Sequence, residues 1–167
     1  VKLPANLRAL PFATFYFCIA LTDVVMPESL TNIGDEAFWY CASLPQIHIP
    51  ASVTNIDNTA FGRCLGMTAF EVDPANTTYK SEDGVLLNAT GDILIQYPLG
   101  NSRTTYTTPE SVANIGDMAF YQANHLSEVT LGENVSTLGG SAFNECKALK
   151  KVTVNATVPP TCYGSDN

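Results

Sequence analysis

The sequence predicts a β-rich α/β solenoid of about seven stacked coils, and three observations predict it. Cys18, Cys41 and Cys64 lie 23 residues apart. Shifting the chain against itself by 23 residues brings whole segments into register, so that Leu21 to Ser43 matches Leu44 to Gly66. Each unit has only about eight apolar positions, too few for a core of its own, so a coil is stable only when stacked on its neighbours.

Composition limits the partners that such a chain can have. Of 167 residues, 46% are hydrophobic and only 14% are charged, and the net charge is -8. This balance excludes a disordered chain and argues against nucleic acid or an anionic bilayer as a partner. The longest apolar run, 12–21, has about ten residues, which is too short for direct membrane insertion.

The repeat divides the chain into units within a single domain, 1–167. The first unit matches from its fourth position onward, and the last is a partial terminal copy. The predicted units are 1–20, 21–43, 44–66, 67–102, 103–125, 126–148 and 149–162.

The first half of each unit reads as a strand. Val24 and Met26 alternate with outward residues, and Pro27 then ends the strand because it has no N–H for the ladder. Stacking one such strand per coil predicts a parallel sheet along one face of the solenoid.

The second half of each unit reads as a bend followed by a short helical turn. Gly34 marks a bend that is expected to need a positive φ. The polar residue after the bend is expected to cap a helical turn of four to six residues. The alternative is a Ca²⁺ site between coils, but the insertion breaks this row, which consists of Asp35, Asn58 and Asp117.

The fourth unit is 36 residues long, 13 more than the repeat. Asp83-Gly84 is a hairpin turn signal, and apolar runs follow at 85–87 and 93–95. The sequence therefore predicts a β-hairpin that projects from the fourth coil.

The unit Leu-x-x-Val-x-Met-Pro-Glu-Ser-Leu-x-x-Ile-Gly-x-x-Ala-Phe-x-x-Cys, at 21–41, resembles the BspA-type class of leucine-rich repeats. That class occurs in surface and secreted proteins of Bacteroidetes, spirochaetes and some protists. The resemblance covers residues 1–160 and includes the long unit with Asp83-Gly84. It implies a right-handed leucine-rich repeat solenoid, an extracellular or bacterial cell-surface location, and a role in adhesion or recognition. It implies no catalytic residue.

The cysteine row offers two kinds of chemistry, disulfides or a thiolate metal site. In-register stacking suits disulfide geometry poorly, and no second ligand type stands at zinc spacing. We therefore interpret Cys18, Cys41, Cys64 and Cys146 as packing residues and expect Cys162 to be the exposed thiol. No metal, cofactor or catalytic site is predicted.

The candidate binding residues are those that point outward from the predicted strands. Seven strands span about 30 Å and give about 350 Å², well below the ~800 Å² that each side of a standard interface buries. Plain solvation of this face is the alternative reading. The candidate residues are Val25, Gln46, His48, Glu71, Thr107, Glu128, Thr130 and Thr153.

Two functions remain open. The first is a non-enzymatic surface or secreted module that binds a protein or glycan, such as host extracellular matrix. The second is a structural spacer within a larger surface protein. Because stacked coils leave open ends, end-to-end self-association is also expected.

Overall fold

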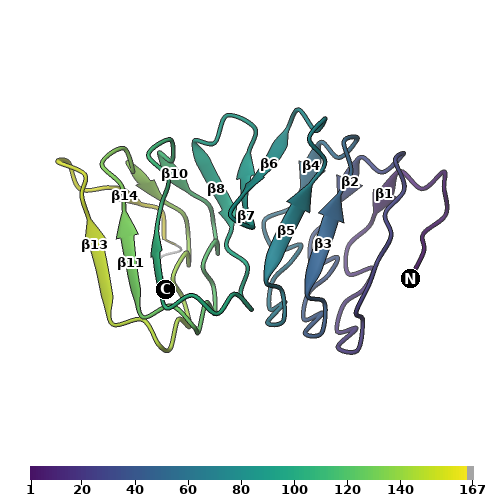
Figure 1. The fold of residues 1–167 in the computed structure, drawn as a ribbon, viewed down its shortest axis with the longest axis horizontal. Helices are drawn as coiled ribbons and strands as arrows, with labels where there is room; N and C mark the ends of the chain where they lie inside the picture. Colours follow the sequence, from purple (N-terminus) through teal and green to yellow (C-terminus); the bar gives the residue numbers. More distant parts are fainter. Residues whose placement is uncertain (165–167) are drawn as a thin grey trace.

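The computed structural model describes residues 1–164, which form a solenoid of about seven coils (Figure 1). Most of its strands stack in parallel, each 23 residues after its neighbour, as in the pairing of Ile47 with Phe70. The predicted repeat solenoid is therefore confirmed. The strands are β1 (Ala9–Leu10), β2 (Asn32–Ile33), β3 (Gln46–Ile49), β4 (Asn55–Ile56), β5 (Ala69–Val72), β6 (Tyr79–Glu82), β7 (Val85–Asn88), β8 (Ile93–Gln96), β9 (Thr105–Thr107), β10 (Asn114–Ile115), β11 (Glu128–Leu131), β12 (Thr137–Leu138), β13 (Lys151–Val154) and β14 (Thr161–Cys162).

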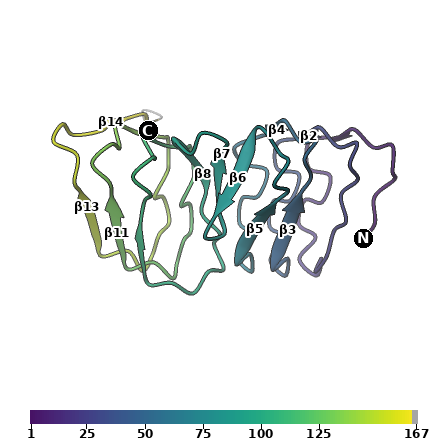
Figure 2. The same ribbon diagram turned by 45° about the horizontal axis from the view of Figure 1, so that its top comes forward.

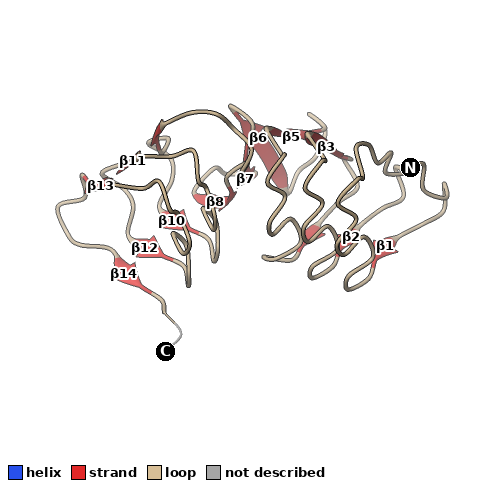
Figure 3. Cartoon of the chain, turned by 90° about the horizontal axis from the view of Figure 1, so that it is seen from below, coloured by secondary structure: helices blue, strands red, loops and turns tan. Residues whose placement is uncertain are grey.

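The predicted sheet face is present but interrupted. We call it the strand face; it comprises a two-stranded sheet, β3-β5, and a three-stranded sheet, β13-β11-β9. Shorter strands line a second face in the orders β1-β2-β4 and β14-β12-β10-β8-β7-β6. Figures 2 and 3 show these two rows, with the hairpin strands β6 and β7 between the halves. The sequence predicted one continuous sheet and missed the second row, whose strands are mostly two residues long.

The core follows the alternation along each strand. Ile47 and Ile49 are buried in β3, while the residues between and beside them are exposed. Aromatic rings stack from coil to coil inside the solenoid, as Phe38 does on Phe61 with ring centroids 5.4 Å apart. Burial of these repeated positions is the main stabilising term, at roughly 25 cal/mol per Å² of apolar area.

No helix occurs among residues 1–164, so the predicted short helical turns are wrong. The Ala-Phe segment is a chain of tight turns, with positive φ at Glu36 (53°) and Tyr40 (59°). Gly34 has no positive φ; a Cβ there would lie 2.8 Å from the carbonyl oxygen of Leu10. The glycine therefore serves the close approach of coils and not the backbone angle.

The predicted caps have another role because there is no helix to cap. Asp35 accepts a hydrogen bond from the hydroxyl of Thr59 in the next coil. Asp117 Oδ1 accepts one from the backbone N–H of Gly140, at 2.7 Å. These polar residues join neighbouring coils along the turn edge.

The insertion does not project; it forms part of the core. β6 and β7 make the predicted hairpin, and β8 continues it antiparallel before pairing with β10. Val85, Leu86 and Leu87 are fully buried, because β7 lies between the N-terminal and C-terminal clusters of core residues. A run of three apolar residues is typical of a strand covered on both faces.

Two polar side chains connect the insertion to the coil before it. Asn76 stands where other units have Leu30 or Val53, and its amide donates to the carbonyls of Pro50 and Val53. The hydroxyl of Tyr79 accepts the N–H of Ile56 at 2.9 Å, in place of a further strand beside β4.

Within residues 1–164, no helix is long and apolar enough to cross a membrane.

Candidate binding surface

The strand face presents the predicted binding residues in two separate patches. The N-terminal patch contains His48 and Glu71, which are paired across β3 and β5 and are both exposed. Gln46 is exposed one pair further along, opposite Ala69. Val25 belongs to a single bridge with Lys2 and is 50% exposed.

The C-terminal patch contains a row of three threonines. Thr107, Thr130 and Thr153 are register partners across β9, β11 and β13. Glu128 lies beside this row, between Thr105 and Lys151. β-Branched side chains in register are also favourable cross-strand neighbours, so this row stabilises the sheet whatever it binds.

Because the two patches do not form one sheet, each is smaller than the predicted face. Two or three strands at about 4.8 Å spacing span only ~10 to 15 Å. This is far from the ~800 Å² that one side of a standard interface buries, so a ligand must use additional surface.

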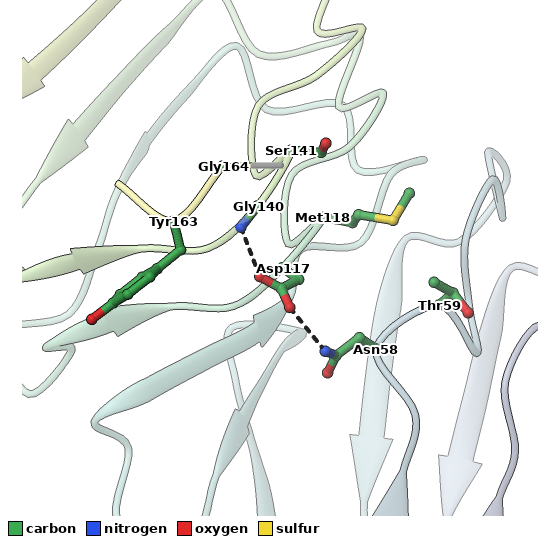
Figure 4. Close-up of a pocket in the computed structure, with 8 residues that line it drawn as sticks. All are labelled: Asn58, Thr59, Asp117, Met118, Gly140, Ser141, Tyr163 and Gly164. Atoms are coloured by element: carbon green, nitrogen blue, oxygen red, sulfur yellow. Dashed lines mark hydrogen bonds between the residues drawn. The ribbon is translucent and has the colours of Figure 1, made fainter. Parts of the chain in front are cut away.

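A shallow depression of about 450 Å³ lies on the turn edge (Figure 4). Asn58 Nδ2 donates to Asp117 Oδ2 at 3.2 Å across it, although 59 residues separate the two in sequence. They meet because the inserted unit places no side chain between them in this row. The depression is lined by Asn58, Thr59, Asp117, Met118, Gly140, Ser141, Tyr163 and Gly164.

A second contact between the halves was not predicted from the sequence. The guanidinium of Arg63 lies 5.7 Å from the ring centroid of Trp39 and 5.8 Å from that of Tyr121. Arg63 also donates to the Tyr121 hydroxyl at 3.0 Å and pairs with Glu145 at 3.7 Å. Hydrogen bonds from Gln122 and from Tyr121 hold the pKa of Glu145 below its usual range. The missing signal is positional, because residues 58 to 82 apart carry no local pattern.

The cysteine prediction is confirmed. All five thiols are free; Cys41 and Cys64 are buried and Cys162 is exposed. The Cys64 thiol donates to the carbonyl of Phe38 in the preceding coil, at 3.0 Å. Burial, followed by the neighbouring Cys18, raises the pKa of the Cys41 thiol to about 11. These thiols are packing residues that also satisfy backbone carbonyls.

Neither chemical alternative finds a cluster of residues to support it. Within residues 1–164, no group of three or more His, Cys, Asp or Glu side chains could hold a metal ion. His48 and His125 are both exposed, and they lie on different units.

The repeat places the chain in a family. The model of the BspA type leucine rich repeat region matches residues 1–83 and 100–162, in six copies. The chain therefore belongs to the BspA-type leucine-rich repeat family. The unmatched segment, 84–99, contains β7 and β8 of the insertion.

Solved structures share the fold over nearly the whole chain. A pneumococcal vaccine antigen, PcpA, is 25% identical with a TM-score of 0.84, covering 91% of this chain and 38% of its own. A leucine-rich cell surface protein of Faecalibacterium prausnitzii is 32% identical with a TM-score of 0.80, covering 91% and 40%. A leucine-rich repeat protein of T. pallidum, at 24% identity and a TM-score of 0.60, covers 98% and 72% and shows the fold alone.

A comparison with curated proteins gives no match. The chain spans about two fifths of the length of the first two structures described above.

Proposed function

We propose that this chain is a non-enzymatic recognition module at the bacterial surface, which binds a protein ligand through the strand face. The observation that carries the proposal is the pair of exposed polar patches on a rigid stack of coils, centred on His48-Glu71 and on the threonine row. Support for the location comes from the surface protein of F. prausnitzii and the pneumococcal antigen, which share the fold.

The test is binding of residues 1–167 to immobilised extracellular-matrix proteins such as collagen and laminin. Replacing His48, Glu71 and Thr130 together by Ala should abolish binding, because the three side chains span both patches. Unchanged binding by this triple variant would contradict the proposal.

A matched control changes the opposite side of the solenoid. Glu28, Asn32 and Asn55 are exposed and lie outside the strand face, so their triple Ala variant removes the same number of side chains and one carboxylate. It should bind like the parent chain.

A structural spacer is the second candidate, favoured by the small area of each patch. Its expected result differs: the isolated chain binds no matrix protein, and shortening it by one whole unit within the parent protein lowers function by reducing reach. Retained binding after removal of a unit outside the patches would count against a spacer.

A further inference from the structure

The strand face is broken between β5 and β9. These strands belong to consecutive units, yet β9 pairs only with β11, and β5 only with β3. Among the described strands, only β11 comes within 8 Å of β9, measured between Cα atoms. Figures 1 and 2 show the hairpin strands β6 and β7 between β5 and the C-terminal sheet. The insertion therefore leaves a free strand edge in the middle of the molecule.

Hydrogen bonding identifies which backbone groups point to this free edge. Glu128 N–H donates to the carbonyl of Thr104 at 3.2 Å, and Thr108 N–H donates to the carbonyl of Thr130 at 3.0 Å. Because successive residues of a strand direct their backbone groups to opposite sides, the groups of 104, 106 and 108 face β11. Those of Thr105 and Thr107 face the break.

Within residues 1–164, these groups have no protein partner. No backbone or side-chain hydrogen bond outside the β9–β11 pairing involves Thr105 or Thr107, and both residues are exposed. Two N–H and two C=O groups therefore remain available in the pattern that another strand would pair with. Such an edge is a template for strand addition, and β9 has no Pro or charged residue that would block it.

The other strand beside the break is already blocked. The hairpin turn covers β5, since Phe70 N–H donates to the carbonyl of Gly84 at 2.9 Å. Ser81 Oγ also donates to the carbonyl of Phe70, at 2.7 Å. A partner strand would therefore add to β9 and leave β5 as it is.

The charges around the break are mainly acidic. Glu82 and Asp83 form the hairpin tip, and both act electrostatically on the hydroxyl of Tyr106 in β9. Glu71 on β5 and Glu128 on β11 add two exposed carboxylates. The nearby cations are Lys80, which pairs with Glu82 at 3.7 Å, and Arg103. Four carboxylates against two cations favour a basic ligand.

We propose that the free edge of β9 binds an extended, basic segment of a protein ligand as an added strand. Its backbone pairs with Thr105 and Thr107, and its cationic side chains lie against Glu82, Asp83 and Glu128. The proposal rests on the recognition function proposed above and specifies its binding mode and partner class. It also supplies the additional surface that the two small patches lack.

The first experiment uses an eight-residue peptide of alternating Lys and Val, with its Glu-Val counterpart as the charge control. Isothermal titration should detect binding of the basic peptide only. Methylating alternate backbone nitrogens, on the edge that would face β9, should weaken binding about tenfold or more, since each paired N–H is worth about a factor of five. Equal binding of the methylated peptide would overturn the added strand.

The second experiment changes the protein. Thr107→Pro removes one N–H that faces the break and leaves the β9–β11 bonds in place, so it should weaken binding to a similar extent. Thr107→Ala, the matched control, keeps the backbone and should bind normally. Should the proline variant fail to fold by circular dichroism, amide exchange of the parent protein decides. The amides of Thr105 and Thr107 should exchange fast alone and slowly with the peptide, whereas slow exchange in the free protein would contradict the free edge.

The two proposals can fail separately. Loss of matrix binding in the strand-face triple variant but full binding in Thr107→Pro would refute strand addition and leave the recognition function standing. A dimer in sedimentation, formed without peptide and lost in Thr107→Pro, would show that a second copy occupies the edge and would overturn the proposed partner.

Discussion

Asn76 should be essential to stability, although a leucine there would restore the repeat. The Asn76 side chain is 9% exposed and makes four hydrogen bonds to the backbone. Its Nδ2 donates to the carbonyls of Pro50 and Val53, at 2.8 and 3.0 Å. Its Oδ1 accepts the N–H groups of Thr78 and Tyr79, both at 2.8 Å.

The cost of Asn76→Leu follows from the groups that lose their partner. Pro50 keeps a second bond, because its carbonyl also accepts the N–H of Val53 at 3.2 Å, and Thr78 is partly exposed. The carbonyl of Val53 and the N–H of Tyr79 are left buried and unpaired, at about 1 to 3 kcal/mol each. Added apolar contacts of the leucine offset part of this. We expect a net loss of about 2 to 5 kcal/mol from a total that is typically about 5 to 15.

Urea unfolding, followed by circular dichroism with the thiols kept reduced, measures this loss. Asn134→Ala is the control: Asn134 is exposed, and its side chain makes one bond, to the carbonyl of Glu110 at 2.8 Å. It should change the free energy of unfolding by less than about 1 kcal/mol. A loss below that value for Asn76→Leu would refute the view that the asparagine anchors the insertion.

Two further predictions concern buried polar atoms. Tyr97→Phe should be neutral or stabilising, because the buried Tyr97 hydroxyl has no partner among residues 1–164, whereas Tyr79→Phe should cost about 1 to 2 kcal/mol because it leaves the Ile56 N–H unpaired. Thermal unfolding of the two variants compares them directly, and an equal effect would contradict this account. The raised pKa of Cys41 means that folding favours its neutral thiol, so this contribution to stability is complete below about pH 9.0 and is lost towards about pH 11. Cys41→Ala should flatten the pH dependence of the free energy of unfolding in that window, while Cys162→Ala should leave it unchanged.

Much of the fold could be predicted because repetition makes the signal local. Cys18, Cys41 and Cys64 report the period, and residues in one position of successive units must lie side by side. The exposed positions of the strands, such as His48 and Glu71, follow from the two-residue alternation. The interpretation of the cysteines as packing residues also depended only on register.

The bend was predicted incorrectly because two physical reasons for glycine look alike in a sequence. Gly34 is required by the close approach of Leu10, and the positive φ occurs two residues later, at Glu36. Without the neighbouring coil in view, the conformational reason could not be separated from the steric one. The helical turn depended on the same assumption and was wrong with it.

The sequence by itself determined the period, the register of the stacked strands and the side of each repeated residue, since every unit must match the next. Only the tertiary structure decided what the insertion does. Val85 to Leu87 have no counterpart in other units, so no register indicates their direction. Their burial between two cores places the hairpin turn against β5, and that packing keeps β9 unpaired on one edge. The free edge therefore arises from contacts between residues that no repeat aligns.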